Sequence, residues 1–306
     1  MKAGSCWSMV GSSPAAGLLR NFIRDHSGLS GPVLLSGEAG VGKSRIARRL
    51  HLDSLRRQQP FEVVDCSEFF SEELCALLFG CGDPSVEACG KPGILRQTGG
   101  GTCYLARCEE MTPAVQDLLR VYVESCSLEG CGEPRFSRLV LSSSKDIGSF
   151  TRAGLFNRRL FDTFSDSRLV VDPLRERLED LGALVSCFTE NSRRPDAVFS
   201  TAALEALSSY PWPGNHRELE GEVNRLTRSV KGAIGVEHLS PRVANFWLGG
   251  RQDPAVSKVS RQLDECLEEL RVLNRLDAAF EGLVGGKSSS AEEVLDPEAR
   301  SSGSAC

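Results

Sequence analysis

The chain has 306 residues, of which 41% are hydrophobic and 25% are charged, and its formal net charge is −5. This length and composition are typical of a soluble globular protein with one large or two modest domains. No apolar run approaches the roughly 18 residues of a membrane span, which excludes a transmembrane protein, and the acidic balance argues against binding nucleic acid by bulk charge.

The first predicted domain follows a lead-in of residues 1–30. Residues 32–36 form a short apolar run that ends at a glycine, as a buried strand does, and the basic stretch 44–57 has apolar residues at helical spacing. Further runs typical of strands lie at residues 61–65, 102–106, 138–142 and 168–171, and helical stretches lie between them at residues 71–79 and 113–125. Strands that alternate with helices predict an α/β fold with a parallel sheet covered on both faces, which we place at residues 31–172.

The pattern changes after residue 173, where helical stretches follow one another with no strand between them. They occupy residues 174–191, 200–210 and 215–230 and predict a small all-α domain over residues 173–245. Residues 254–284 are predicted to form one amphipathic helix. The last segment, residues 285–306, is polar and rich in small residues, which is typical of a disordered tail.

Twelve cysteines are spread along the chain without a CxxC pair, and the four histidines lie far apart. Cys103 and Cys108 are separated by four residues, as are Cys126 and Cys131, which leaves a zinc or redox site open. Reduced thiols at apolar positions are the favoured alternative, because the chain is long and its start lacks the apolar core of a secretory signal. We therefore expect a cytoplasmic protein.

The most specific motif follows the first predicted strand. It matches GxxxxGK[ST] and consists of Gly37, Glu38, Ala39, Gly40, Val41, Gly42, Lys43 and Ser44. The glycines let backbone N–H groups converge on phosphate oxygens, the lysine places a positive charge on the β- and γ-phosphates, and the serine can ligate Mg²⁺. The helix N-terminus that follows also favours an anion. The sequence therefore predicts a nucleotide site for ATP or ADP.

Two later segments are specific enough to indicate a family. Residues 212–219, WPGNHREL, resemble a WPGNxREL signature, and residues 174–181, LRERLEDL, resemble an LRER…ED segment. Both belong to the AAA+ domain of sigma-54-dependent transcriptional activators, the bacterial enhancer-binding proteins, and the resemblance runs from about residue 9 to about residue 245. It implies a P-loop AAA+ sheet domain followed by an all-α lid, in which Arg217 senses the γ-phosphate.

The second motif strand departs from the pattern of this family. There, the strand ends in Asp-Glu, of which the aspartate holds Mg²⁺ and the glutamate polarises the attacking water. Here it ends in Ala106 and Arg107, and neither can do this work, since alanine has no ligand atom and arginine is always protonated. We therefore expect weakened Mg²⁺ binding. Glu109 and Glu110 are alternative acids, although they lie two or three residues past the predicted strand end.

Three further functional positions of the family also differ. The asparagine that pairs with the missing glutamate corresponds to Asp65, and the sensor position after the next strand corresponds to Ser144. The arginine-finger segment GxFRxDLYYRL corresponds to residues 154–164, in which both finger positions are changed. Arg158 and Arg159 lie next to these positions and are the alternative fingers.

Two parts with which the family contacts other molecules are missing from the pattern. The GAFTGA loop, which grips sigma-54, corresponds to residues 84–89, and nothing of it survives. The C-terminal stretch 257–306 contains six Lys or Arg against ten Asp or Glu, a net charge of −4, and no basic recognition helix. We therefore expect no sigma-54 contact and no DNA binding by this chain alone.

Three hypotheses for function follow. The first is an ATP-binding pseudo-ATPase that regulates transcription through protein contacts, as a homo-oligomeric ring or within rings of intact family members. The second is an active ATPase that remodels sigma-54 RNA polymerase with displaced catalytic residues, and the third is a non-catalytic scaffold in which Lys43 has no role. The first is favoured because the general base and the arginine fingers are both changed. A general base contributes about 10²–10⁴-fold to the rate and an arginine finger about 10³–10⁵-fold, so the loss of both would leave turnover near background.

Overall fold

The structure is a computed structural model that describes residues 9–80, 92–128 and 136–249. Residues up to Ala244 belong to one compact unit, and Asn245–Gly249 are the described part of a second. The predicted helix at 254–284, the predicted tail at 285–306 and the segment 84–89 lie outside the described residues. None of the described helices is long and apolar enough to cross a membrane.

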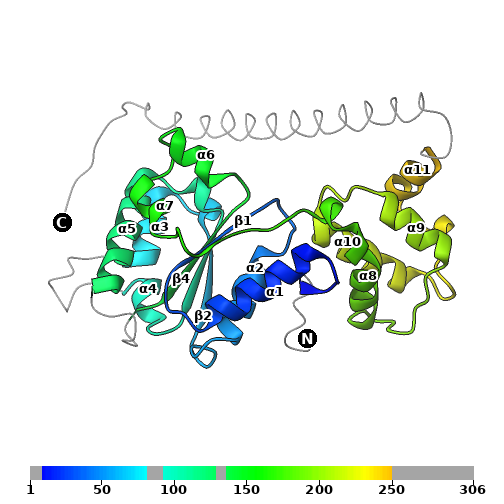
Figure 1. The fold of residues 1–306 in the computed structure, drawn as a ribbon, viewed down its shortest axis with the longest axis horizontal. Helices are drawn as coiled ribbons and strands as arrows, with labels where there is room; N and C mark the ends of the chain where they lie inside the picture. The colour runs from blue at the N-terminus through cyan, green and yellow to red at the C-terminus, as the bar shows by residue number, and fades with distance from the viewer. Residues whose placement is uncertain (1–8, 81–91, 129–135, 250–306) are drawn as a thin grey trace, which may run out of the picture. The chain divides into compact units, whose positions relative to one another are not determined.

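Five parallel strands form the sheet of the first unit (Figure 1). In chain order they are β1 (Val33–Ser36), β2 (Phe61–Asp65), β3 (Thr102–Ala106), β4 (Arg138–Ser143) and β5 (Arg168–Val170), and their order across the sheet is β2-β3-β4-β1-β5. Val33 lies beside Val140, and Thr102 lies beside Arg138. The carboxyl ends of all strands therefore meet at one edge. The predicted parallel α/β sheet is confirmed.

Helices and short 3-10 turns precede and connect these strands. They are α1 (Pro14–Ser27), α2 (Lys43–Leu52), η2 (Cys66–Glu68), α3 (Ser71–Phe79), α4 (Ile94–Gln97), η3 (Cys108–Glu110), α5 (Pro113–Leu128), α6 (Ile147–Arg152) and α7 (Arg158–Asp162). Four of them, α1, η2, α6 and α7, begin at a polar side chain that accepts a hydrogen bond from the first turn. Ser13 accepts the N–H of Ala16, and Asn157 accepts the N–H of Leu160, each at 3.0 Å. Such caps satisfy N–H groups that have no partner within the helix.

The sheet separates two apolar layers, because successive strand residues point to opposite faces. In β1, Val33 and Leu35 pack in the same layer as Ile46 of α2. Leu34, between them, packs in the other layer together with Leu119 of α5. All five side chains are almost fully buried. Burial on both faces explains why the strands are short apolar runs without polar alternation.

The chain after β5 is helical, as predicted. It forms η4 (Leu174–Glu176), η5 (Leu178–Asp180), α8 (Leu181–Glu190), α9 (Thr201–Ser209), α10 (Asn215–Ser229), η6 (Val236–His238) and α11 (Pro241–Gly249). The expected helix from residue 174 instead starts as two 3-10 turns. Arg177 separates them with a φ of −140°, and its side chain is buried. The all-α lid is confirmed, and the exact limits of the predicted domains stay predictions.

Candidate nucleotide site

The glycine-rich loop between β1 and α2 turns through three glycines with positive φ. These angles are 146° at Gly37, 81° at Gly40 and 96° at Gly42, a region of backbone space that other residues disfavour. A Cβ atom at Gly40 would lie 2.2 Å from the carbonyl oxygen of Gly214 in the lid. The loop is therefore turned by glycine and also packed directly on the lid backbone.

Lys43 is held by the loop that precedes it. Its Nζ donates to the backbone oxygens of Gly37 at 2.6 Å and Glu38 at 2.8 Å. Burial lowers the pKa of this ammonium from 10.5 to about 8, and the nearby carboxylate of Glu109 opposes the shift. Most of the lysine is still protonated at neutral pH, so the loop carries the positive charge that phosphate oxygens need. Ser44 follows in the first turn of α2 and is exposed.

Two lid residues hold the side chain of Glu38 in the loop. Arg175 donates to its two carboxylate oxygens at 2.8 and 2.7 Å, and Asn215 Nδ2 donates to Oε2 at 3.1 Å. Asn215 also donates to the backbone oxygen of Ala39 at 3.0 Å and accepts the N–H of Leu174 at 2.7 Å. The hydrogen bond from Arg175 is the main reason that the pKa of Glu38 is lowered.

Arg175 and Asn215 are site residues that the sequence did not predict. Each lies in one of the two family signatures, Arg175 in LRER and Asn215 in WPGN. Membership of these signatures is the sequence signal that could have identified them. Asn215 has a φ of 53° and is fully buried. Asparagine tolerates this left-handed conformation better than most residues do.

Arg217, the predicted γ-phosphate sensor, lies near the start of α10. Its backbone N–H donates to the carbonyl oxygen of Gly40 at 3.3 Å, while its side chain is exposed and forms no ion pair with any described residue. Close to it, Arg45 of α2 pairs with Glu220 of α10 at 3.0 Å. A cation therefore lies beside the loop, as the predicted role requires, and the role itself stays a prediction.

The strand that carries the second motif ends at Ala106, as predicted. Arg107 follows with a left-handed φ of 55° and directs its guanidinium to Asp65 at the end of β2. Its Nε lies 2.6 Å from Asp65 Oδ1, and its Nη2 pairs with Oδ2. Burial alone would raise the pKa of Asp65, but the hydrogen bonds from Arg107 and Ser67 outweigh burial and lower it. Arg107 and Asp65, two of the positions that differ from the family pattern, thus form an ion pair.

The two alternative acids lie differently in η3. Glu109 Oε1 accepts the backbone N–H of Ser144 at 2.9 Å, whereas Oε2 is buried and has no hydrogen-bond partner among the described residues. Glu110 is exposed. Both lie past the end of β3, as predicted, and whether either acts as a catalytic acid stays a prediction. The left-handed backbone of Arg107 and the following 3-10 turn place Glu109 at the sheet edge.

Glu109 lies at the same sheet edge as the glycine-rich loop. β4 neighbours β1, and its last residue, Ser143, accepts the N–H of Gly37 at 3.3 Å. The next residue, Ser144, donates to Glu109, and this carboxylate is near enough to Lys43 to influence its pKa. The loop, its lysine and this acid therefore belong to one site.

The alternative fingers lie apart from these contacts. Arg158 and Arg159 begin α7 and are exposed. Arg158 lies 3.8 Å from Asp162, four residues later in the same helix. Within the described chain, no hydrogen bond or ion pair joins either arginine to the loop. A finger acts on the site of a neighbouring subunit, so their role stays a prediction.

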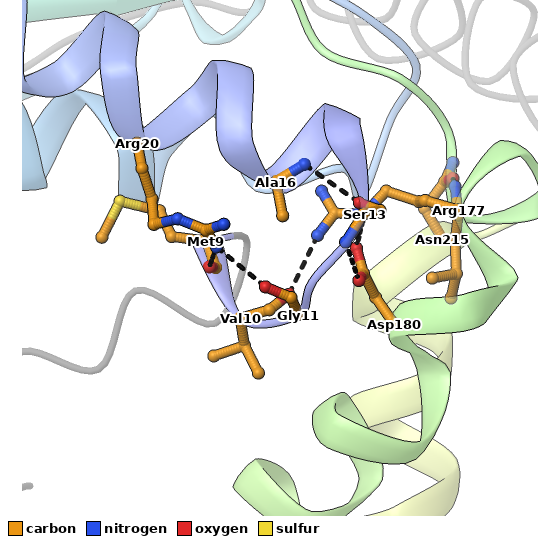
Figure 2. Close-up of polar contacts among 10 residues, drawn as sticks. Met9, Val10, Gly11, Ser13, Ala16, Arg20, Arg177, Asp180 and Asn215 are labelled. Carbon is orange, nitrogen blue, oxygen red and sulfur yellow. Dashed lines mark hydrogen bonds and ion pairs between the residues drawn. The ribbon is translucent and has the colours of Figure 1, made fainter.

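A buried cluster joins the segment before α1 to the start of the lid (Figure 2). Ser13 donates to Asp180 from its backbone N at 2.9 Å and from Oγ at 2.5 Å. Arg177 Nε lies 3.0 Å from Asp180 Oδ2, and both side chains are fully buried. Arg177 also donates to the carbonyl oxygen of Val10 at 3.2 Å, and Arg20 donates to two further carbonyl oxygens of this segment. The lid is thus tied to the N-terminal segment as well as to the loop.

The described cysteines show no arrangement for metal binding. Cys66, Cys103 and Cys108 are buried and not in disulfide bonds, and burial raises the pKa of Cys66 and Cys103 to about 12. Thiols that stay protonated are poor metal ligands and nucleophiles. Among the residues that the structure describes, no group of three or more His, Cys, Asp or Glu side chains could hold a metal ion.

Two family models match the chain. The sigma-54 interaction domain matches residues 9–169, and the AAA+ ATPase lid domain matches residues 175–249. The chain belongs to the sigma-54 interaction domain family. The resemblance carried by the WPGN and LRER segments is therefore confirmed.

Relatives of this sigma-54 interaction domain are transcriptional regulators. XylR of Pseudomonas putida is 33% identical over 255 residues, which cover 79% of this chain and 45% of that protein. ZraR of Klebsiella oxytoca is 30% identical over 246 residues, which cover 77% of this chain and 55% of that protein. The chain spans about half the length of these curated relatives.

Solved structures of a similar fold contain nucleotides. NtrX from Brucella abortus in complex with ADP is 26% identical, with a TM-score of 0.66 over 77% of this chain and 55% of that chain. NtrX in complex with ATP is also 26% identical, with a TM-score of 0.65 over 76% of this chain and 54% of that chain. These likenesses agree with a nucleotide site at the glycine-rich loop.

Proposed function

We propose that this sigma-54 interaction domain binds ATP or ADP together with Mg²⁺ and regulates transcription through protein contacts, with little or no ATP hydrolysis. The observation that carries the nucleotide part is the placement of Lys43 in a glycine-turned loop, which Arg175 and Asn215 of the lid contact through Glu38. The ATP and ADP complexes of NtrX support the same ligands for this chain.

Weak hydrolysis is proposed because of the residues at the end of β3. Ala106 has no ligand atom, and the guanidinium of Arg107 is engaged by Asp65 and cannot accept a proton. Loss of a positioned general base reduces the rate about 10²–10⁴-fold, and loss of an arginine finger about 10³–10⁵-fold. Binding is less affected, because the loop amides, Lys43 and Arg217 do not depend on these groups.

Protein contacts are the proposed means of regulation. The family forms assemblies in which one subunit contributes to the site of the next, so a ring of copies of this chain or a mixed ring with intact members is the proposed partner. Residues 84–89, where the family carries GAFTGA, do not have that motif. The proposal therefore includes no direct sigma-54 contact and no DNA binding by this chain alone.

An active ATPase is the second candidate. The position of Glu109 favours it, because this acid is held at the sheet edge by Ser144 and is near enough to Lys43 to influence its pKa. It also needs Arg158 or Arg159 to reach a neighbouring site. The third candidate, a scaffold without nucleotide, is not favoured by any contact among the described residues.

Nucleotide binding to the purified chain tests the proposal. Isothermal titration with ATP in the presence of Mg²⁺ is expected to show binding by the wild type and by Lys231→Ala, since Lys231 is an exposed lysine of the lid. Lys43→Ala is expected to bind far more weakly, because it removes the charge that faces the phosphates. Equal affinity of Lys43→Ala and Lys231→Ala would contradict the proposal and leave the scaffold.

A further inference from the structure

We infer that Glu109 supplies the protein carboxylate that holds Mg²⁺ beside the phosphates of the bound nucleotide, in place of the acid that is missing at Ala106. The inference rests on the proposed function, since it needs a nucleotide in the loop. Glu109 lies in η3, outside the motif strand β3, and takes over the Mg²⁺ binding that this strand provides in the family.

The carboxylate of Glu109 is held at the sheet edge. η3 packs against the end of β4, and Glu109 Oε1 is fixed there by the N–H of Ser144 at 2.9 Å. Ser143, the preceding residue, accepts the N–H of Gly37 at the start of the glycine-rich loop. One hydrogen bond therefore positions Glu109 relative to the same backbone that positions the loop.

The other carboxylate oxygen of Glu109 is available to a cation. Glu109 Oε2 is buried and has no hydrogen-bond partner among the described residues. Burial of a carboxylate oxygen without a partner costs free energy, because the oxygen loses its hydrogen bonds to water and no other hydrogen bond replaces them. A cation at this oxygen would remove that cost.

The neighbouring acids are less suited to hold the ion. Asp65 is engaged by both donors of Arg107, and Glu38 is engaged by Arg175 and Asn215. Glu110, in the same turn as Glu109, is exposed. In the described part of the chain, Glu109 is thus the acid at this sheet edge that has a buried oxygen left to bind a cation.

The ligand preference of Mg²⁺ fits this placement. Mg²⁺ binds oxygen ligands, keeps several waters and is commonly held by one or two carboxylates together with substrate phosphates. One carboxylate beside the loop, with the hydroxyl of Ser44 at the start of α2, fits such an ion. One carboxylate and one hydroxyl do not hold Mg²⁺ without the phosphates. Among the described residues, no group of three or more His, Cys, Asp or Glu side chains could hold a metal ion.

The test compares Glu109→Gln with Glu110→Gln, which removes the same charge from the same turn. The glutamine side chain of the first variant keeps an oxygen that accepts the N–H of Ser144, so the turn is retained. A non-hydrolysable ATP analogue with a fluorescent ribose label is the probe, and Mg²⁺ is titrated from a metal-free start while binding is followed. Circular dichroism and urea unfolding confirm that both variants are folded.

The expected result is a rise in the Mg²⁺ midpoint for Glu109→Gln of about tenfold or more, the usual loss when a group that supports a metal is removed. Glu110→Gln is expected to stay close to the wild type. Without metal, Glu109→Gln is expected to bind the probe more tightly than the wild type, because a negative charge beside the phosphates is gone. A Mg²⁺ midpoint that is the same in all three proteins would overturn the inference.

The result is separable from the outcome for the proposed function. Failure of the proposed function is a loss of all Lys43-dependent binding of the probe, with or without Mg²⁺. Failure of this inference is Lys43-dependent binding whose response to Mg²⁺ does not change in Glu109→Gln. The readout is affinity, so it does not require the chain to hydrolyse ATP.

Discussion

At the scale of single residues, the charge of Lys43 depends on two opposing influences. Burial disfavours the ammonium and lowers its pKa to about 8, and the carboxylate of Glu109 limits this decrease. A phosphate bound beside the ammonium would favour its charged form further. Binding of nucleotide therefore has to be coupled to the protonation of this lysine.

Nucleotide affinity is expected to fall as the pH rises. Because the pKa of Lys43 without ligand is about 8, affinity should be nearly constant below pH 7 and should approach a tenfold loss per pH unit above pH 8, since one pKa unit corresponds to about 1.4 kcal/mol. Two nearby groups do not titrate in this window, since the pKa of Cys66 is about 12 and that of His216 is about 3. Titrations with the fluorescent analogue between pH 6.5 and pH 9.5 measure this loss, and a flat profile would contradict it. Lys43→Ala is the control.

Gly40 is required by both its conformation and its neighbour. Its φ is 81°, and an added Cβ would lie 2.2 Å from the carbonyl oxygen of Gly214. Gly40→Ala is therefore expected to reduce the free energy of unfolding by about 1–3 kcal/mol, the usual cost of a strained backbone position. Gly221→Ala, in α10 with open space around it, should gain about 0.5–1 kcal/mol. Urea unfolding measures both, and equal stability of the two variants would refute the packing argument.

At the scale of elements, the buried pair of Arg177 and Asp180 joins the lid to the segment before α1. Burial alone would raise the pKa of Asp180, but the two hydrogen bonds from Ser13 and the charge of Arg177 outweigh burial and lower it. A carboxyl whose pKa is lower in the folded state stabilises that state above its unfolded pKa. This stabilisation is lost as the pH falls through the folded pKa.

Asp180→Asn is expected to destabilise the protein by about 3–5 kcal/mol at pH 7, because it removes the negative charge that faces the buried guanidinium of Arg177. The difference from the wild type should begin to shrink below about pH 4, where aspartates of the unfolded chain become protonated, and should be lost as the pH falls through the lower pKa of Asp180 in the folded state. Urea unfolding at pH 7 and at a series of pH values below about 4 measures both effects. Asp25→Asn is the control, since Asp25 pairs with Arg24 in solvent and should change stability by at most about 1 kcal/mol. A pH-independent difference would contradict the assignment.

The elements also show what the sequence can predict. The loop at 37–44 was recognisable because its residues are contiguous, and the strands because their apolar runs are short and bounded. The contact of Glu38 with Asn215 was not, because the two residues are 177 positions apart in the chain. The return of Glu109 to the sheet edge depends on a left-handed backbone at Arg107, which no residue pattern marks. Local chemistry was predictable, and long-range placement was not.

At the scale of the whole molecule, the chain combines the glycine-rich loop and lid of its family with altered residues where the family carries out hydrolysis. The loop, Glu38 and the lid residues Arg175 and Asn215 form a continuous set of contacts. The acids of the second motif are replaced by Ala106 and by an arginine that is engaged in an ion pair. A protein of this kind is expected to hold nucleotide and to influence the subunits around it without turning it over.

The most direct test of this account follows ATP binding and phosphate release in the same sample, for the wild type and for Lys43→Ala in the presence of Mg²⁺. We predict binding that depends on Lys43, with phosphate release no faster than in the sample without protein. Phosphate release by the wild type that disappears in Lys43→Ala would contradict the account and show that the chain is an active ATPase. Glu109→Gln in the same assay would then test whether Glu109 takes part in that hydrolysis.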